Sequence, residues 1–215
     1  MSRQKRLALA MKRLGEELPT LASLVDVPRV QGGEAEELLV AAARIEAALP
    51  APVPSSAVEL SLLFLAGGDR ARSRRHAEEA ARAQNAEPEV SARAHALLGR
   101  LDELAYEPLA ALGHYRLAAD LDPASWRHQL DLAAILVDIG EEAGLEEAGG
   151  ALTVAAALAG DLDPIAHVRA QWQVRRGRRA LALATFEELA TQADDPVATD
   201  AARWIAALRR EDENE

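Results

Sequence analysis

Histidine is the side chain in this sequence best suited to bind a metal ion or to transfer a proton near neutral pH. The chain has five histidines, and no two are three, four or five residues apart, so no single helix presents a histidine pair to a metal. No histidine follows a carboxylate residue by three positions, as in the di-metal motif of helix bundles. We predict packing or surface roles for these residues, and we expect no bound metal or other cofactor. They are His76, His95, His114, His128 and His167.

Other signatures of catalysis do not occur in the sequence. There is no cysteine to act as a nucleophile, and the glycine patterns of phosphate loops, dinucleotide loops and nucleophile elbows are missing. Paired acidic residues such as Glu141-Glu142 are expected to be solvated. We therefore predict no catalytic residue and a role other than that of an enzyme. An active site assembled from distant residues remains an open alternative.

The charge balance limits the partners that the chain can bind. Lys and Arg total 24 against 35 Asp and Glu, for a net charge of -11, which repels nucleic-acid backbones and anionic membranes. We expect neither as a partner. No stretch is apolar enough over the length of a bilayer, and the N-terminus lacks the apolar core of a secretory signal, so we expect a cytoplasmic protein. Lys5 and Lys12 are the only lysines, a bias that we attribute to a GC-rich bacterial genome.

Alanine content and proline spacing predict an all-helical chain built from helix pairs. The chain has 48 alanines and is 3% aromatic, a composition that favours closely packed helices over strands. An acidic residue precedes proline at five places, and in four of these pairs the prolines follow one another at intervals of 35, 41 and 32 residues. Proline suits the first position of a helix, and the acidic side chain before it can cap that helix. We attribute the long interval to an insertion near Ala143-Gly144. The four pairs are Glu87-Pro88, Asp122-Pro123, Asp163-Pro164 and Asp195-Pro196.

Residues 91–123 carry the most specific pattern. Leu97, Leu101 and Leu104 recur at helical spacing, and Pro108 restarts the chain as a second helix. Six positions resemble the tetratricopeptide repeat: Leu-Gly in the first helix, then a small residue, an aromatic, an alanine and a proline at the family's spacing. These residues are Leu98, Gly99, Ala111, Tyr115, Ala118 and Pro123. The resemblance implies an all-α fold, a right-handed superhelical array of antiparallel helix pairs.

The sequence also predicts how the segments on either side of this repeat are organised. We expect residues 1–50 to form an N-terminal helical cap or a degenerate repeat, with an amphipathic helix from Arg3 to Leu18 and another from Glu34 to Leu49. A linker follows at residues 51–56, and Ser56 with Glu59 predicts a capping box at the start of the next helix. The final three parts are about four tetratricopeptide-like helix pairs in residues 57–196, a capping helix in residues 197–210, and an acidic tail in residues 211–215.

The resemblance also implies where a partner binds. In that family the first helices of the pairs line a concave groove that holds peptides or partner helices. Placing the exposed first-helix positions of the family onto two repeats of this chain gives eight candidate contact residues. They are Arg93, Ala96, Arg100, Glu103, Arg127, Leu130, Ala134 and Val137. We therefore expect a protein-interaction module or scaffold, with a groove that suits an acidic or amphipathic segment.

Several alternatives stay open from the sequence. The chain could be a regulatory subunit or enzyme with a site that no motif reveals, an RNA-binding pentatricopeptide-like array, or a homo-oligomeric assembly protein. Two arginine clusters at predicted turns are either solvated surface or sites for an anion, since guanidinium groups grip carboxylate and phosphate. The clusters are Arg70, Arg72, Arg74 and Arg75, and Arg175, Arg176, Arg178 and Arg179.

Overall fold

The computed structural model describes residues 33–49, 53–160, 162–191 and 196–212, and every regular element in these ranges is an α-helix. The predicted all-α class is therefore confirmed for this part of the chain. The helix that we predict from Arg3 to Leu18 lies outside the described residues. The ten helices are α2 (Gly33–Ala48), α3 (Pro54–Ala66), α4 (Arg70–Arg82), α5 (Pro88–Glu103), α6 (Pro108–Leu121), α7 (Trp126–Ile139), α8 (Glu142–Ala159), α9 (Asp163–Arg175), α10 (Arg179–Leu189) and α11 (Pro196–Asp212).

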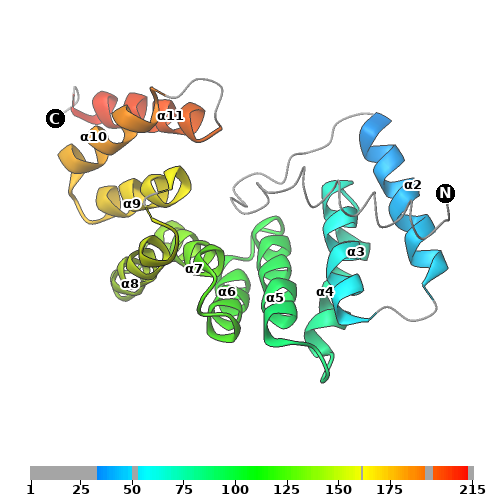
Figure 1. Ribbon diagram of the computed structural model, residues 1–215. Helices are drawn as coiled ribbons and strands as arrows, with labels where there is room; N and C mark the ends of the chain where they lie inside the picture. The colour runs from blue at the N-terminus through cyan, green and yellow to red at the C-terminus, as the bar shows by residue number, and fades with distance from the viewer. Residues whose placement is uncertain (1–32, 50–52, 161, 192–195, 213–215) are drawn as a thin grey trace.

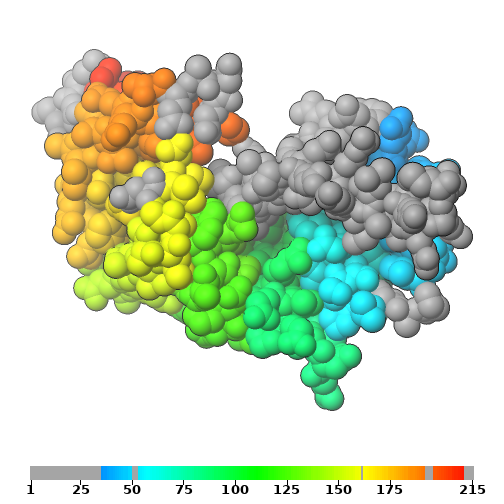
Figure 2. All heavy atoms as spheres, in the orientation of Figure 1, coloured from blue at the N-terminus to red at the C-terminus, as the bar shows by residue number. Residues whose placement is uncertain are grey.

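The helices pack in sequential pairs. Helix α3 packs with α4, α5 with α6, α7 with α8 and α9 with α10, and these are four helix pairs in the region where about four are predicted. The odd-numbered helices from α3 to α11 also contact one another in order, and we call these five helices the odd-helix layer. Figure 1 shows the succession from blue α2 to orange and red α10 and α11, and the colours follow one another along the body in Figure 2.

Proline and glycine set several helix boundaries. Helix α5 begins at Pro88 and α11 at Pro196, as the acidic–proline pairs predict, whereas Pro123 lies in the turn before α7. Glu87 makes no side-chain capping hydrogen bond, so the capping role predicted for it is wrong. Its backbone carbonyl instead accepts from the amides of the first turn, which serves the helix start without the side chain. Gly140 ends α7 with a φ of 75°, a left-handed conformation that glycine adopts at low cost.

Three predicted boundaries differ from the structure. Helix α3 starts at Pro54, so Ser56 lies inside the helix and does not cap it, because the proline already supplies a favourable first position. Ala143 and Gly144 lie within the 18-residue helix α8, so a longer helix, and not an inserted loop, accounts for the long interval between prolines. At the other end α11 continues to Asp212, into the predicted tail.

The apolar core of the described residues is divided among neighbouring helices. One cluster joins α2 to α3, a second joins α3, α4 and α5, and a third joins α9, α10 and α11. The largest runs through α6, α7, α8 and α9, and it places α7 at the centre of the array. Each pair therefore buries its apolar face against the pairs next to it in sequence, as in stacked repeat proteins.

In the repeat of residues 91–123, helices α5 and α6 approach each other closely where Gly99 of α5 meets Tyr115 of α6. A Cβ atom at Gly99 would lie 2.7 Å from the Tyr115 ring, closer than carbon atoms pack in proteins. The ring, which is 2% exposed, therefore occupies space that any residue with a side chain would fill. This contact gives a physical reason for the glycine and the aromatic at these two positions.

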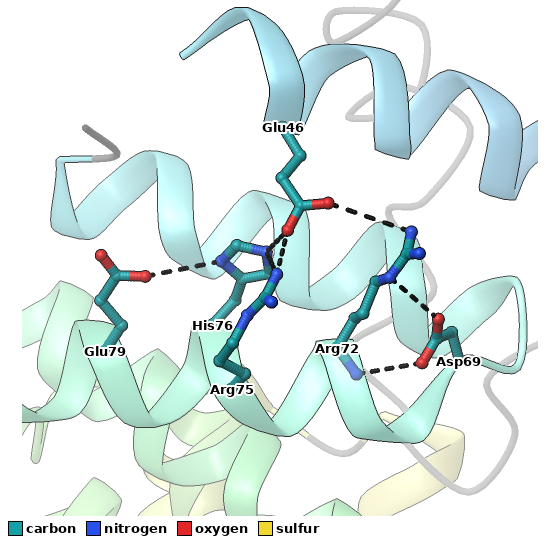
Figure 3. A network of polar contacts seen from close by, with 6 residues as sticks. All are labelled: Glu46, Asp69, Arg72, Arg75, His76 and Glu79. Carbon is teal, nitrogen blue, oxygen red and sulfur yellow. Dashed lines mark hydrogen bonds and ion pairs between the residues drawn. The ribbon is translucent and has the colours of Figure 1, made fainter. Parts of the chain in front are cut away.

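A polar network attaches α2 to α4 (Figure 3). Glu46 of α2 accepts a hydrogen bond from Arg75, and the same carboxylate oxygen lies 3.0 Å from Nε2 of His76. Its other oxygen lies 3.9 Å from Nη1 of Arg72. The His76 ring also stacks on Phe64 of α3, with 5.6 Å between ring centroids. Helices α2, α3 and α4 are thus joined by one carboxylate and one buried imidazole.

Within the described ranges every helix is too short or too polar to span a lipid bilayer.

Replacement of Gly99 by alanine tests the packing of α5 against α6. We expect Gly99→Ala to lower the free energy of unfolding by roughly 1–3 kcal/mol, because the added methyl group overlaps the Tyr115 ring. Gly113 of α6 is the matched control, since nothing lies within 4 Å of a Cβ built there. Gly113→Ala should raise the free energy of unfolding by roughly 0.5–1 kcal/mol. Urea unfolding measures both, and stabilisation by Gly99→Ala would contradict the packing described here.

Candidate functional site

Five of the eight predicted contact residues lie in the odd-helix layer with at least part of their surface exposed. Arg93, Arg100 and Glu103 belong to α5, and Arg127 and Ala134 belong to α7. These two helices are neighbours in the layer. The structure therefore brings the five residues onto adjacent helices, while their contact with a partner stays a prediction.

The exposure predicted for the other three residues is wrong. Ala96, Leu130 and Val137 are 4%, 4% and 2% exposed. The reason is the central position of α7, which contacts α5, α6, α8 and α9 and so has most of its circumference covered. Leu130 and Val137 belong to the largest core cluster. Helix α5 is similarly surrounded by α3, α4, α6 and α7.

Arg93 is engaged within the odd-helix layer. Its Nη2 donates to Oε1 of Glu59 on α3 at 2.6 Å, and both side chains remain more than a third exposed. An exposed ion pair of this kind contributes little to stability, typically under about 1 kcal/mol. The pair links α3 to α5. Arg93 therefore already has a carboxylate partner within the chain, and does not need one from a binding partner.

Glu103, at the end of α5, gathers polar partners from two helices. The hydroxyl of Tyr115 donates to its Oε2 at 2.5 Å, and Nη1 of Arg100 donates to the same oxygen at 3.3 Å. Burial, followed by the charges of Asp131 and Glu103, raises the pKa of Tyr115 well above its ordinary value. The phenol therefore stays protonated and acts as a fixed donor to Glu103.

Asp131 and Asp138 of α7 are the site residues that the sequence reasoning missed. The Oδ2 atom of Asp131 is shielded from solvent and has no hydrogen-bond partner. Desolvation and then Glu103 raise the pKa of Asp131 to about 8, against the opposing effect of Arg100 and Arg127. Desolvation and Glu103 also raise the pKa of Asp138. Glu103 thus acts on both aspartates. We call Arg100, Glu103, Tyr115, Arg127, Asp131 and Asp138 the polar cluster.

A sequence signal for the two aspartates exists. Both stand in a helix whose other residues are largely apolar, with Asp131 between two leucines and Asp138 between valine and isoleucine. An acidic side chain within an apolar stretch of a helix is unusual, so such positions indicate a structural or functional role.

The two arginine clusters take part in contacts between helices. Arg74 donates to Asp102 of α5 at 2.6 Å, Arg176 pairs with Glu142 of α8, and Arg179 donates to the Leu208 carbonyl at 2.9 Å. Arg178 lies over the ring of Trp172 at 5.5 Å. These contacts support a structural role for the arginines more than an anion site.

The histidines fall into two groups. His76, His128 and His167 are buried, which places them among the packing residues and not on the surface, the two roles that we predict for the histidines. His95 of α5 and His114 of α6 instead lie together on neighbouring helices, an arrangement that spacing along one helix does not reveal. In the part of the chain that the structure describes, no group of three or more His, Asp or Glu residues is placed to hold a metal ion.

These features define an all-helical protein whose ten described helices pack in sequential pairs. Comparison with family models, with curated proteins and with solved structures finds no match to the chain.

The raised pKa of Asp131 predicts how stability depends on pH. The native carboxyl keeps its proton up to about pH 8, whereas the unfolded one loses it near pH 4, so this group destabilises the fold increasingly between those values. Asp131→Asn should remove this destabilisation, which lowers the free energy of unfolding by on the order of a few kcal/mol. We expect the variant to be more stable than the wild type at pH 8.5 and similar to it at pH 4.5, in urea unfolding. Asp120→Asn on the exposed side of α6 is the control, and equal pH profiles for the wild type and Asp131→Asn would refute the assignment.

Proposed function

We propose that the chain is a tetratricopeptide-type α-solenoid, with its helix pairs stacked in a right-handed superhelix. Two observations support this finer description of the fold. Odd-numbered helices contact both their own partner and the next odd-numbered helix, as stacked pairs require. Five of the six residues that resemble the repeat are buried in α5 and α6, namely Leu98, Gly99, Ala111, Tyr115 and Ala118.

The function that we propose is that of a non-catalytic scaffold that binds a peptide or a partner helix along the odd-helix layer. The observation that carries the proposal is the shielded Oδ2 of Asp131, which lacks a hydrogen bond in the middle of a charged and partly exposed cluster. Nearly all buried polar atoms of folded proteins have partners, so this orphaned carboxyl oxygen marks a group whose hydrogen bonding is incomplete in the isolated chain. A groove formed by successive helices also suits an extended or helical segment.

The charges favour a basic segment over the acidic one expected from the sequence. Arg93 already pairs with Glu59, and Arg100 with Glu103. Desolvation, and then Glu103, raises the pKa of Asp131 and that of Asp138, so a cation from a partner beside these groups would favour their ionised forms. We therefore propose a partner segment with a lysine or arginine side chain opposite these carboxyl groups.

Site-specific photo-crosslinking in the native cells tests the proposal. A photoreactive amino acid at Ala134, which is partly exposed on α7, should give crosslinked species of discrete mass. The same residue at Thr153, exposed on α8 of the even-numbered series, is the matched control and should give far fewer. Adding Asp138→Lys to the Ala134 probe should reduce the crosslinked fraction at least about tenfold, since like charges repel a basic partner.

Three outcomes would count against the proposal. Equal crosslinking at the two positions would show that the odd-helix layer is not the binding face. Crosslinking that Asp138→Lys leaves unchanged would reject the basic partner. Adducts composed only of two copies of this chain would replace the scaffold with the self-assembly alternative. Circular dichroism confirms that each variant remains helical.

A further inference from the structure

His95 and His114 form a facing pair between the two helices of the best-defined repeat. Their Nδ1 atoms lie 3.1 Å apart, with 5.3 Å between the ring centroids and 28° between the ring planes. His95 belongs to α5 and His114 to α6, 19 residues further along the chain. Both side chains are partly exposed, so solvent reaches the pair.

We propose that His95 and His114 together bind a divalent transition-metal ion of the kind that prefers imidazole, such as Zn²⁺, through their two Nδ1 atoms. Zinc–imidazole bonds are about 2.0–2.1 Å long, so nitrogens 3.1 Å apart subtend an angle of about 95–100° at the metal. That angle lies between the octahedral and tetrahedral values, and the solvent-exposed side leaves room for water ligands.

A buried carboxylate lies near the second ring nitrogen of His114, as is common for histidines that bind metals. Oδ2 of Asp102 lies 3.8 Å from Nε2 of His114, and Asp102 itself is 2% exposed. Nη2 of Arg74 donates to Oδ1 of Asp102 at 2.6 Å and so fixes the carboxylate. Its negative charge favours the His114 tautomer with hydrogen on Nε2, which leaves the Nδ1 lone pair free to bind the metal.

The protonation state of the pair suits metal binding. One Nδ1 must donate to the other, and the tautomer of His114 makes His95 the donor. When the metal binds, the His95 proton moves from Nδ1 to Nε2 through solvent, so two neutral imidazoles coordinate without net loss of a proton.

A bound metal ion would cross-link α5 and α6. Both ligands come from the helices that also meet at Gly99 and Tyr115, so the ion would stabilise that contact, by an amount that grows with the logarithm of its concentration above its dissociation constant. This site is separate from the proposed partner-binding function, because neither histidine belongs to the polar cluster.

Calorimetric titration of the tag-free protein with Zn²⁺ at pH 7.5 tests the proposal. We expect one ion per chain, and at least tenfold weaker binding by His95→Gln and by His114→Gln. His128→Gln, which alters a buried histidine outside the pair, is the control and should bind as the wild type does. Asp102→Asn should weaken binding by about 10–100-fold. The melting temperature should rise with Zn²⁺ in the wild type and in His128→Gln.

Imidazole NMR of the wild type gives a second readout that needs no variant. Zn²⁺ should shift the Nδ1 resonances of His95 and His114 and leave those of His76, His128 and His167 in place. The proposal is overturned if the wild type binds no stoichiometric Zn²⁺, if both glutamine variants bind as tightly as the wild type, or if other histidines carry the shifts.

Discussion

The contact between Gly99 and the ring of Tyr115 is the constraint on which the middle of this array depends. Only a residue without a Cβ atom lets the ring lie so close to α5, and the ring then carries its hydroxyl to Glu103. His95 is one helical turn before Gly99, and His114 directly precedes Tyr115, so the same approach of α5 to α6 also brings the two imidazoles together. One packing contact thus positions both the polar cluster and the histidine pair.

Around this contact each helix is stabilised by the helices next to it in sequence. No single helix pair buries its apolar face alone, and each core cluster of the described residues joins consecutive helices. Glu46 and His76 attach α2 at one end with polar contacts, whereas Phe186 and Trp204 stack at 5.6 Å to attach α11 at the other. The central helix α7 is in contact with four other helices, and the desolvation of Asp131 on it accounts for most of the raised pKa of that residue.

Much of the fold could be predicted because its signals are local. Alanine content, helical spacing of leucines and helix-starting prolines indicate the pairs, and the Leu98-Gly99 and Tyr115 pattern marks their closest contact. The site could be predicted only in part. Leu130 and Val137 look like first-helix surface by repeat position, yet they are buried because α7 has helices on both flanks of the layer. Glu103 raises the pKa of Asp131 from another helix, and His95 meets His114 across two helices, and spacing along one helix does not reveal such pairs.

The central claim is that stability declines outward from α7, because every helix depends on its neighbours in sequence. Native-state hydrogen exchange tests it most directly, since it reports the opening free energy of each helix. The slowest exchange is expected in α6, α7 and α8, and progressively faster exchange toward α2 at one end and α11 at the other. Uniform protection from α2 to α11, or a least stable region at α7, would contradict it.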